Sequence, residues 1–185
     1  MRYFYFVILV LVFSLAAGTF VSLNTAAAAG DAELDREVKG ALEKLYGKSD
    51  SARALGKKAK GILIFPGIVK GGFLVGGQYG EGALIEGGKT TGYYNTVQVS
   101  YGLQAGLQKY GYALFLMSDS ARKWIDKTDG WEIGVGPSIV VMDEGKATSK
   151  TTTTMQSDIY AFFFDQTGLM AGLGLQGTKI TKIEK

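Results

Sequence analysis

The sequence of 185 residues contains no cysteine and no histidine, and only two prolines. Without cysteine there is no disulfide framework, no thiol nucleophile and no cysteine zinc site. Without histidine there is no imidazole general base and no serine triad of the usual kind. Catalysis would depend on carboxylate, lysine, serine or tyrosine side chains, and no group of these stands out. We therefore predict a protein that is not an enzyme, with no catalytic residue, no metal site and no cofactor.

An excess of charge of one sign is also missing. Lysine and arginine number 20 and aspartate and glutamate 17, so the net charge is +3. This excess is too small to indicate nucleic-acid binding on charge alone. A hydrophobic content of 46% argues against a disordered chain. Glycine is abundant, with 27 residues, about twice the usual share of about 7%.

Residues 1–29 have the pattern of a secretory signal peptide. Met1 and Arg2 precede an apolar run over residues 3–21, and four alanines at 26–29 are the small residues that signal peptidase accepts. An uncleaved membrane anchor is the alternative, because about 20 apolar residues can span a bilayer. We expect export to the periplasm or cell envelope, as a free or membrane-associated protein, and one domain over residues 30–185.

The first part of that domain is predicted to be helical. Apolar residues recur at helical spacing over residues 32–46, and Gly47 is expected to end this helix. Ser49 or Asp50 is the expected N-cap of a second, shorter helix that Gly61 would end. A third short helix is predicted over residues 118–127.

The remaining segments have the pattern of strands separated by glycines. Short apolar runs are predicted as strands, at residues 62–65, 72–77, 83–85, 112–117, 131–142 and 159–164. Strict alternation over residues 97–108 predicts one long strand with a bend at Gly102 or Gly106. No long helix separates the strands. The predicted fold is therefore α+β, with N-terminal helices packed on a glycine-rich, mainly antiparallel β-sheet or sheet-like barrel.

Two segments resemble parts of enzyme sites. Residues 83–90 end in Gly-Gly-Lys-Thr like a phosphate loop, but Ala83 replaces the first glycine and a hairpin turn at residues 87–88 is the stronger interpretation. Asp165 follows an aromatic strand, which could desolvate its carboxylate and raise its pKa. The favoured alternative for Asp165 is a turn residue at the strand end.

Lysines form the better functional candidate. Lys57, Lys58 and Lys60 lie close together beside Arg53, and Lys70 lies between two predicted strands. A solvated basic face is the default explanation. The functional alternative is contact with anionic lipid headgroups, worth about 1 kcal/mol per lysine near a charged surface. Three lysines would give only marginal binding, so a second contribution from apolar contact or oligomerisation would be needed.

Several separated motifs resemble the SYLF domain family. The opening motif spans residues 59–65 and 68–75, and the resemblance continues through residues 134–137 to its strongest parts at 158–162 and 168–177. The resemblance covers about residues 34–183. It implies a single α+β domain that binds membrane phospholipid, with actin binding in some members, and the chain looks like an exported bacterial-type member. Lys60 and Lys70 match basic positions of the opening motif.

Two functions remain from the sequence. The first is a non-enzymatic phospholipid-binding module of the cell envelope, with Lys57, Lys58, Lys60 and Lys70 contacting an anionic membrane surface. The second is a structural or self-associating envelope protein, as a sheet or as a small outer-membrane barrel that uses the alternation over residues 97–108. Actin binding follows from the family resemblance alone, and the sequence identifies no protein partner.

Overall fold

The computed structural model describes residues 31–72, 75–101, 106–126, 130–142, 157–167, 175 and 177–185. Its contacts divide the chain into two units, residues 1–33 with residue 185, and residues 34–184. In the first unit, residues 31–33 are helical, and a carboxylate oxygen of Asp31 lies 3.9 Å from Nζ of Lys185. Residues 34–184 contain both hydrophobic cores and all the described strands.

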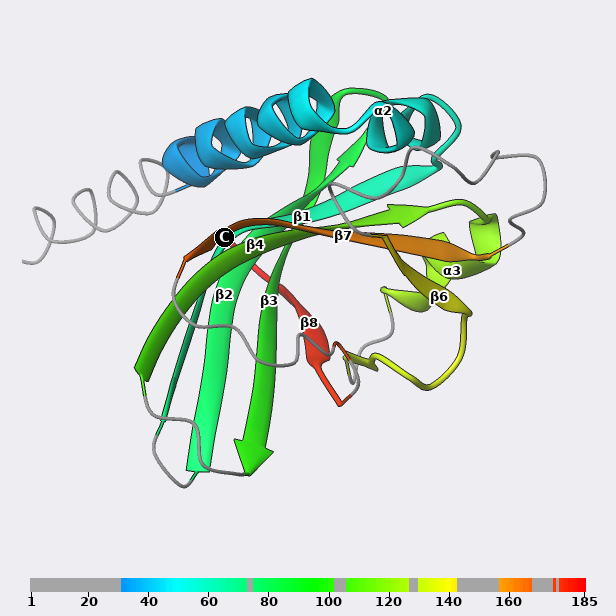
Figure 1. Cartoon of the computed structure of the whole chain (residues 1–185). Helices are drawn as coiled ribbons and strands as arrows, with labels where there is room; N and C mark the ends of the chain where they lie inside the picture. The colour runs from blue at the N-terminus through cyan, green and yellow to red at the C-terminus, as the bar shows by residue number, and fades with distance from the viewer. Residues whose placement is uncertain are drawn as a thin grey trace, which may run out of the picture. The chain divides into compact units, whose positions relative to one another are not determined.

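The described strands form one strongly curled sheet, a half-barrel, with helices packed on it (Figure 1). Their order is β5-β8-β3-β2-β1-β4-β7-β6, and every neighbouring pair is antiparallel except β6 and β7. This arrangement confirms the predicted fold class. The strands are β1 (Gly61–Gly72), β2 (Val75–Glu86), β3 (Lys89–Tyr101), β4 (Gly106–Leu116), β5 (Trp131–Glu132), β6 (Ile139–Met142), β7 (Ile159–Thr167) and β8 (Lys179–Ile183).

Two successive helices cover part of the outer face of the sheet. The first runs through residues 31–48, so the prediction that Gly47 ends it was wrong. The next residue, Ser49, is the N-cap of α2 (Asp50–Gly56), and its hydroxyl accepts a hydrogen bond from the backbone N–H of Ala52. This confirms the predicted cap, although α2 is shorter than predicted.

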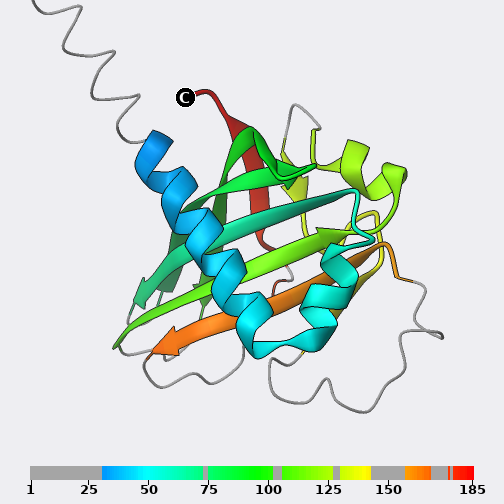
Figure 2. The ribbon, with the colours of Figure 1, turned by 90° about the horizontal axis from the view of Figure 1, so that it is seen from above.

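The first helix lies across the strands rather than along them (Figure 2). Near its start, the carboxylate of Asp35 accepts hydrogen bonds from Thr90 and Tyr93 of β3. Near its end, Nζ of Lys44 contacts the carboxylate of Asp165 in β7 at 2.7 Å. The helix therefore spans the sheet from β3 to β7 over the three strands between them.

Alternation along the strands creates a core on each face of the sheet. The inner core fills the concave face, where α3 (Asp119–Trp124) and β5 pack on it. The outer core lies between the sheet and the first two helices. The largest buried side chains of the inner core are Trp131, Tyr94, Tyr110, Tyr112 and Phe65, and those of the outer core include Phe115, Phe162, Phe164 and Leu45.

Glycines on the concave face of β2 permit the tight curl. A Cβ at Gly82 would lie 2.2 Å from the carbonyl oxygen of Ile64, and a Cβ at Gly80 would lie 2.7 Å from Cγ1 of Ile68. Side chains at these two positions would therefore push β2 away from β1. Hydrogen bonds also cross the concave side, because Tyr112 of β4 donates to the Thr96 hydroxyl of β3 at 2.8 Å.

The alternating segment 97–108 is not one strand, so that prediction was wrong. Residues 97–101 complete β3, and residues 106–108 begin β4. In the sheet, β3 and β4 are separated by β2 and β1. Of the two positions predicted for the bend, Gly102 lies outside the described residues and Gly106 is the first residue of β4. Period-2 alternation specifies which face each residue occupies, and two strands in the same sheet can share that pattern across their connection.

Several other boundaries also differ from the predictions. The segment predicted at 62–65 belongs to the longer strand β1, whereas the segment predicted at 72–77 is divided, because Gly72 ends β1 and residues 75–77 begin β2. Only residues 131–132 and 139–142 of the segment 131–142 are strand. The C-terminal strand β8 was not predicted. The hairpin turn at Gly87 and Gly88 is confirmed, with φ of 56° and 80°, the left-handed region that a tight hairpin turn needs.

A charged cluster connects α3 to the turn end of β2. The guanidinium of Arg122 donates to both carboxylate oxygens of Glu86 and also to Asp126. Asp126 in turn accepts a hydrogen bond from the phenol of Tyr94 at 2.7 Å. The hydrogen bond from Arg122 lowers the pKa of the Glu86 carboxyl below its ordinary value.

We predict that Gly82→Ala lowers the free energy of unfolding by about 3 kcal/mol, because the added Cβ meets backbone that cannot move away. The control is Gly47→Ala in the first helix, where nothing lies within 4 Å of the added Cβ and alanine favours helix. Urea denaturation measures both variants. Equal midpoints for the two would contradict the role of Gly82 in the curl.

We predict that Arg122→Met lowers the free energy of unfolding at pH 7 by about 2 kcal/mol, because two partly buried carboxylates lose their partner. The lowered pKa of Glu86 means that its contribution is present above its unfolded pKa and is lost as pH falls through the folded value. The free energy of unfolding, measured by urea denaturation, should therefore fall more steeply toward acid pH for the natural sequence than for the variant. Lys60→Met, which removes an exposed ion pair, is the control.

Candidate functional site

The structure places three of the predicted lysines together. Lys57 is the C-cap of α2, and Lys58 and Lys60 follow it in the connection to β1. All three side chains are exposed, and Nζ of Lys60 lies 3.6 Å from a carboxylate oxygen of Asp119. These residues form a small basic group at the start of β1.

Lys70 does not join that group. It lies ten residues beyond Lys60, near the opposite end of β1, which corresponds to roughly 33 Å of extended strand. Alternation also places it on the concave face with Ile68. It pairs in register with Gln78 of β2 and Gln108 of β4. The four predicted lysines therefore cannot form a single contact surface.

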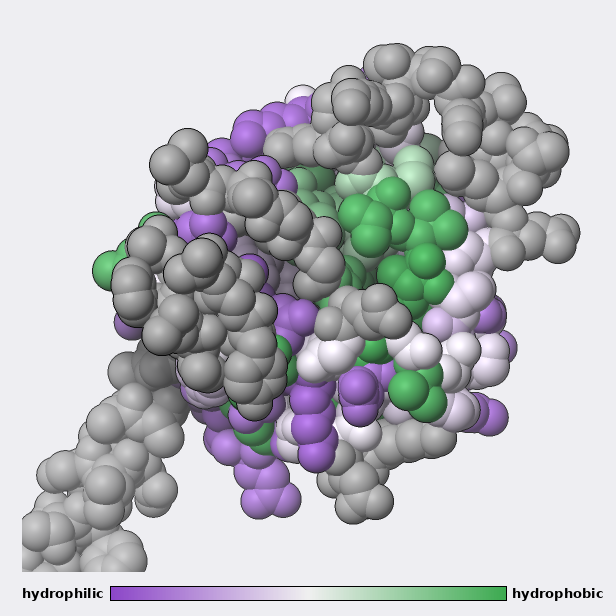
Figure 3. All heavy atoms as spheres, turned by 60° about the horizontal axis from the view of Figure 1, so that its bottom comes forward, coloured by the Kyte–Doolittle hydropathy of each residue, from purple (hydrophilic) through white to green (hydrophobic). Residues whose placement is uncertain are grey.

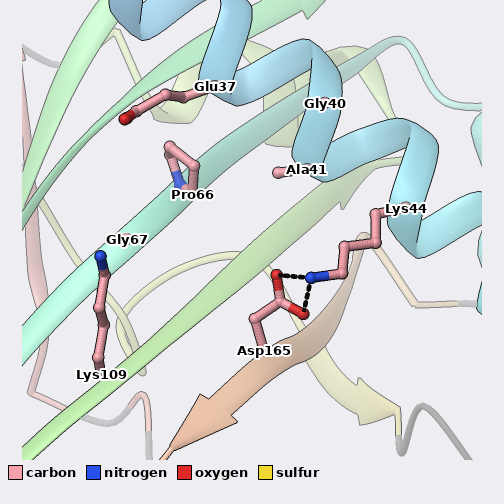
Figure 4. A pocket seen from close by; sticks show the side chains of 8 residues that line it. All are labelled: Glu37, Gly40, Ala41, Lys44, Pro66, Gly67, Lys109 and Asp165. Atoms are coloured by element: carbon pink, nitrogen blue, oxygen red, sulfur yellow. Dashed lines mark hydrogen bonds and ion pairs between the residues drawn. The ribbon is translucent and has the colours of Figure 1, made fainter.

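A pocket of about 290 Å³ lies elsewhere, where the first helix borders the open part of the outer sheet face. The helix forms one side of it and β1, β4 and β7 form the other (Figure 4). Its lining residues are Glu37, Gly40, Ala41, Lys44, Pro66, Gly67, Lys109 and Asp165.

Two β-bulges create this pocket. In β1 one extra residue lies at Pro66 and Gly67, because Phe65 and Ile68 pair with residues of β4 that are only two apart. In β7 the extra residue lies near Asp165, which has φ of 51°. The bulges lie on either side of β4, opposite Tyr110 and Gly111, next to Lys109. Proline is tolerated inside β1 because a bulge removes its place in the hydrogen-bond ladder.

Ionisable groups dominate the pocket. Nζ of Lys44 lies 2.7 Å from the carboxylate of Asp165, and Nζ of Lys48 lies 3.6 Å from the same group. The side chain of Lys109 lies over Gly67. Among the described residues, the side chains of Lys109 and Glu37 have no ion pair or hydrogen bond. Three ammonium groups and two carboxylates thus meet at or beside one pocket.

The pKa of Asp165 is lowered, not raised. The hydrogen bond from Lys44 is the main cause, and it outweighs the desolvation that sequence analysis considered. Asp165 is also inside β7 rather than in a turn after the strand, although its left-handed backbone resembles a turn. The nearby positive charge comes from a helix about 120 residues earlier, so the sequence around Asp165 gave no sign of it.

Lys44, Lys48 and Lys109 were not predicted as a group from the sequence. The first two are four residues apart and thus share one face of the helix, which is a signal visible in the sequence. Lys109 joins them only through the pairing of β4 with β1 and β7. Lys44 and Lys48 already pair with Asp165, so Lys109 is the ammonium group of these three without an ion pair among the described residues.

Two further properties concern the described residues alone. No group of three or more acidic side chains there could hold a metal ion. No helix in that part of the chain is long and apolar enough to cross a bilayer.

We predict that Lys44→Met raises the pKa of Asp165 toward its ordinary value, because the closest ammonium group is lost. Carboxyl ¹³C chemical shifts recorded during an acid titration measure this pKa. Lys48→Met should raise it less, since its ammonium group is farther away at 3.6 Å. An unchanged pKa in the first variant would show that Lys44 does not pair with Asp165 in solution.

The Ysc84 family model, described as "Las17-binding protein actin regulator", matches residues 97–185. The match begins within β3 and includes every later described element, from β4 to β8. No curated protein matches the chain.

Proposed function

Because residues 97–185 of this chain belong to the Ysc84 (SYLF) family, we propose that the protein is a non-enzymatic module that binds anionic phospholipid. The family is associated with lipid binding and actin regulation. The observation that carries the proposal is the lysine-lined pocket between the first helix and the bulged strands. In our proposal, Lys109 contacts the headgroup phosphate, and Lys44 and Lys48 supply further positive charge.

The charges of the pocket support a phosphate ligand. Lys44, Lys48 and Lys109 contribute three positive charges, and Asp165 and Glu37 contribute two negative ones. The remaining single positive charge would be neutralised by one phosphodiester, the group that phosphatidylglycerol carries. Lysine binds phosphate as a point charge and needs no fixed ligand geometry, which suits exposed side chains on a helix and a strand.

The expected strength of this contact is modest. At about 1 kcal/mol per net positive charge near an anionic surface, the single net charge of the pocket provides about 1 kcal/mol, or roughly fivefold in partitioning. Exposed lysines are also screened by salt. Stable association therefore needs an additional apolar contribution from the same side of the sheet.

Other predictions from the sequence remain predictions. Headgroup contact by Lys57, Lys58 and Lys60, or by Lys70, is tested below against the pocket. Export through residues 1–29 and location in the periplasm or envelope form part of the same proposal. Actin binding rests on the family resemblance alone.

We predict that the triple variant Lys44→Gln, Lys48→Gln, Lys109→Gln binds anionic vesicles roughly a hundredfold more weakly than the natural sequence. The matched control is Lys57→Gln, Lys58→Gln, Lys60→Gln, which removes the same total charge from the other basic group. Lys70→Gln is a third variant. Co-sedimentation of residues 30–185, which retain both cores, with phosphatidylglycerol vesicles measures binding without the apolar run at residues 3–21.

The comparison separates three results. A selective loss in the pocket variant supports the proposed site. An equal loss in both triple variants would contradict the pocket while retaining charge-driven lipid binding. No sedimentation of the natural sequence with anionic vesicles, from a folded protein, would contradict the proposed function itself.

A further inference from the structure

The outer face of the sheet continues beyond the helices as an exposed apolar surface. Of the seven large hydrophobic side chains that are exposed among the described residues, five lie on this face. Their exposed fractions range from 40% to 78%. Figure 3 shows another side of the molecule, where hydrophobic residues gather right of centre, on the side where Figure 1 draws α3 and β6. We define the apolar sheet face as Val69, Tyr79, Val97, Val99 and Leu107.

Strand register places these residues side by side. Val69 of β1 pairs with Tyr79 of β2, which pairs with Val97 of β3. Two residues farther along the strands, Leu107 and Val99 lie in a second row. The middle positions of that row are Gly71 and Gly77, so the surface between the two apolar side chains is low and flat.

Lysines border the apolar sheet face at both ends of its first row. Lys109 of β4 pairs with Val69, and Lys179 of β8 pairs with Val97. The row crosses five adjacent strands, a width of about 19 Å at about 4.8 Å per strand spacing. Glu81 is the acidic neighbour, and it accepts a hydrogen bond from the phenol of Tyr79. Lys109 also lines the pocket, so the two surfaces share this residue.

We propose that the apolar sheet face docks on an anionic phospholipid bilayer. This inference rests on the proposed function and identifies the surface that lies against the membrane. Apolar side chains between lysines fit the boundary of such a bilayer, where acyl chains lie below negatively charged headgroups. Tyr79 is suited to the same boundary, because tyrosine has an apolar ring and a polar end.

Docking through the apolar sheet face would also bring the pocket close to the membrane. Lys109 lies between the pocket and Val69 on one face of the sheet. A headgroup bound at Lys109 would therefore place its acyl chains beside Val69 and Leu107. The apolar contact supplies the contribution that lysines alone lack.

A pair of single-cysteine variants tests the proposal, because the chain has no cysteine of its own. Val99→Cys and Val135→Cys are matched, since the natural side chains are 58% and 59% exposed. Each is labelled with nitrobenzoxadiazole in residues 30–185 and mixed with vesicles of phosphatidylglycerol and phosphatidylcholine. We predict a blue-shifted, stronger emission at position 99 that brominated acyl chains quench, and little change at position 135.

Each outcome is informative. Sedimentation with vesicles and an unchanged label at position 99 would overturn the docking surface but retain the proposed function. No sedimentation would overturn both. A blue shift at position 99 without vesicles, together with a dimer in sedimentation velocity, would identify a second copy as the occupant and overturn the bilayer assignment.

A second pair of variants measures the apolar contribution without a label. Val69→Thr, Val99→Thr preserves the β-branched shapes of the side chains, and Val135→Thr, Val141→Thr is the control with nearly equal exposure. At high salt, where the Debye length falls to a few ångström, we expect about tenfold weaker partitioning for the first pair and no change for the control. Equal partitioning would overturn the proposal.

Discussion

The close approach of β1 and β2 is the constraint on which the rest of this structure depends. Without a Cβ at Gly80 and Gly82, the backbone and side chains of β1 can lie against β2 on the concave face. The resulting curl brings β4 within hydrogen-bond distance of β3 through Tyr112 and Thr96, although two strands lie between them. The inner core therefore fills a half-barrel instead of one side of a flat sheet.

The outer face of the curled sheet has two parts, one covered by helices and one exposed. The first helix and α2 cover the part that contains Ile64, Phe115 and Phe162. The strands extend past the helices, and their outer positions there remain exposed at Val69 and Val99. Pro66 and Gly67 lie at the transition, where a bulge changes the alternation so that Phe65 and Ile68 both face the inner core. One irregularity thus forms the pocket and also determines which side chains continue on the outer face.

Much of the fold could be predicted from the sequence because its signals are local. Helical spacing, the Ser49 cap and the Gly87-Gly88 turn each depend on a few neighbouring residues. Strand boundaries were harder, because Pro66 and Gly67 resemble the end of a strand when only sequence neighbours are considered. Strand β8 was missed, because lysines occupy its exposed positions and only Ile180 is fully buried.

The candidate site could be predicted only in small part. The lysine group after α2 is continuous in sequence, but the pocket combines a helix, two bulges and Lys109 through sheet pairing. Sequence proximity suggested an aromatic environment that would raise the pKa of Asp165, whereas the hydrogen bond from Lys44 lowers that pKa in the folded chain. Lys44 and Asp165 are far apart in the sequence, and the fold brings them into contact.

The ends of the sheet affect how copies of this protein can associate. The described edge strands are β5 and β6, with two and four residues. A short edge presents few unpaired N–H and C=O groups, so another chain can add little backbone pairing there. At β5 and β6 the sheet thus remains open without offering a long template for fibre growth, which a closed barrel avoids by having no edge at all.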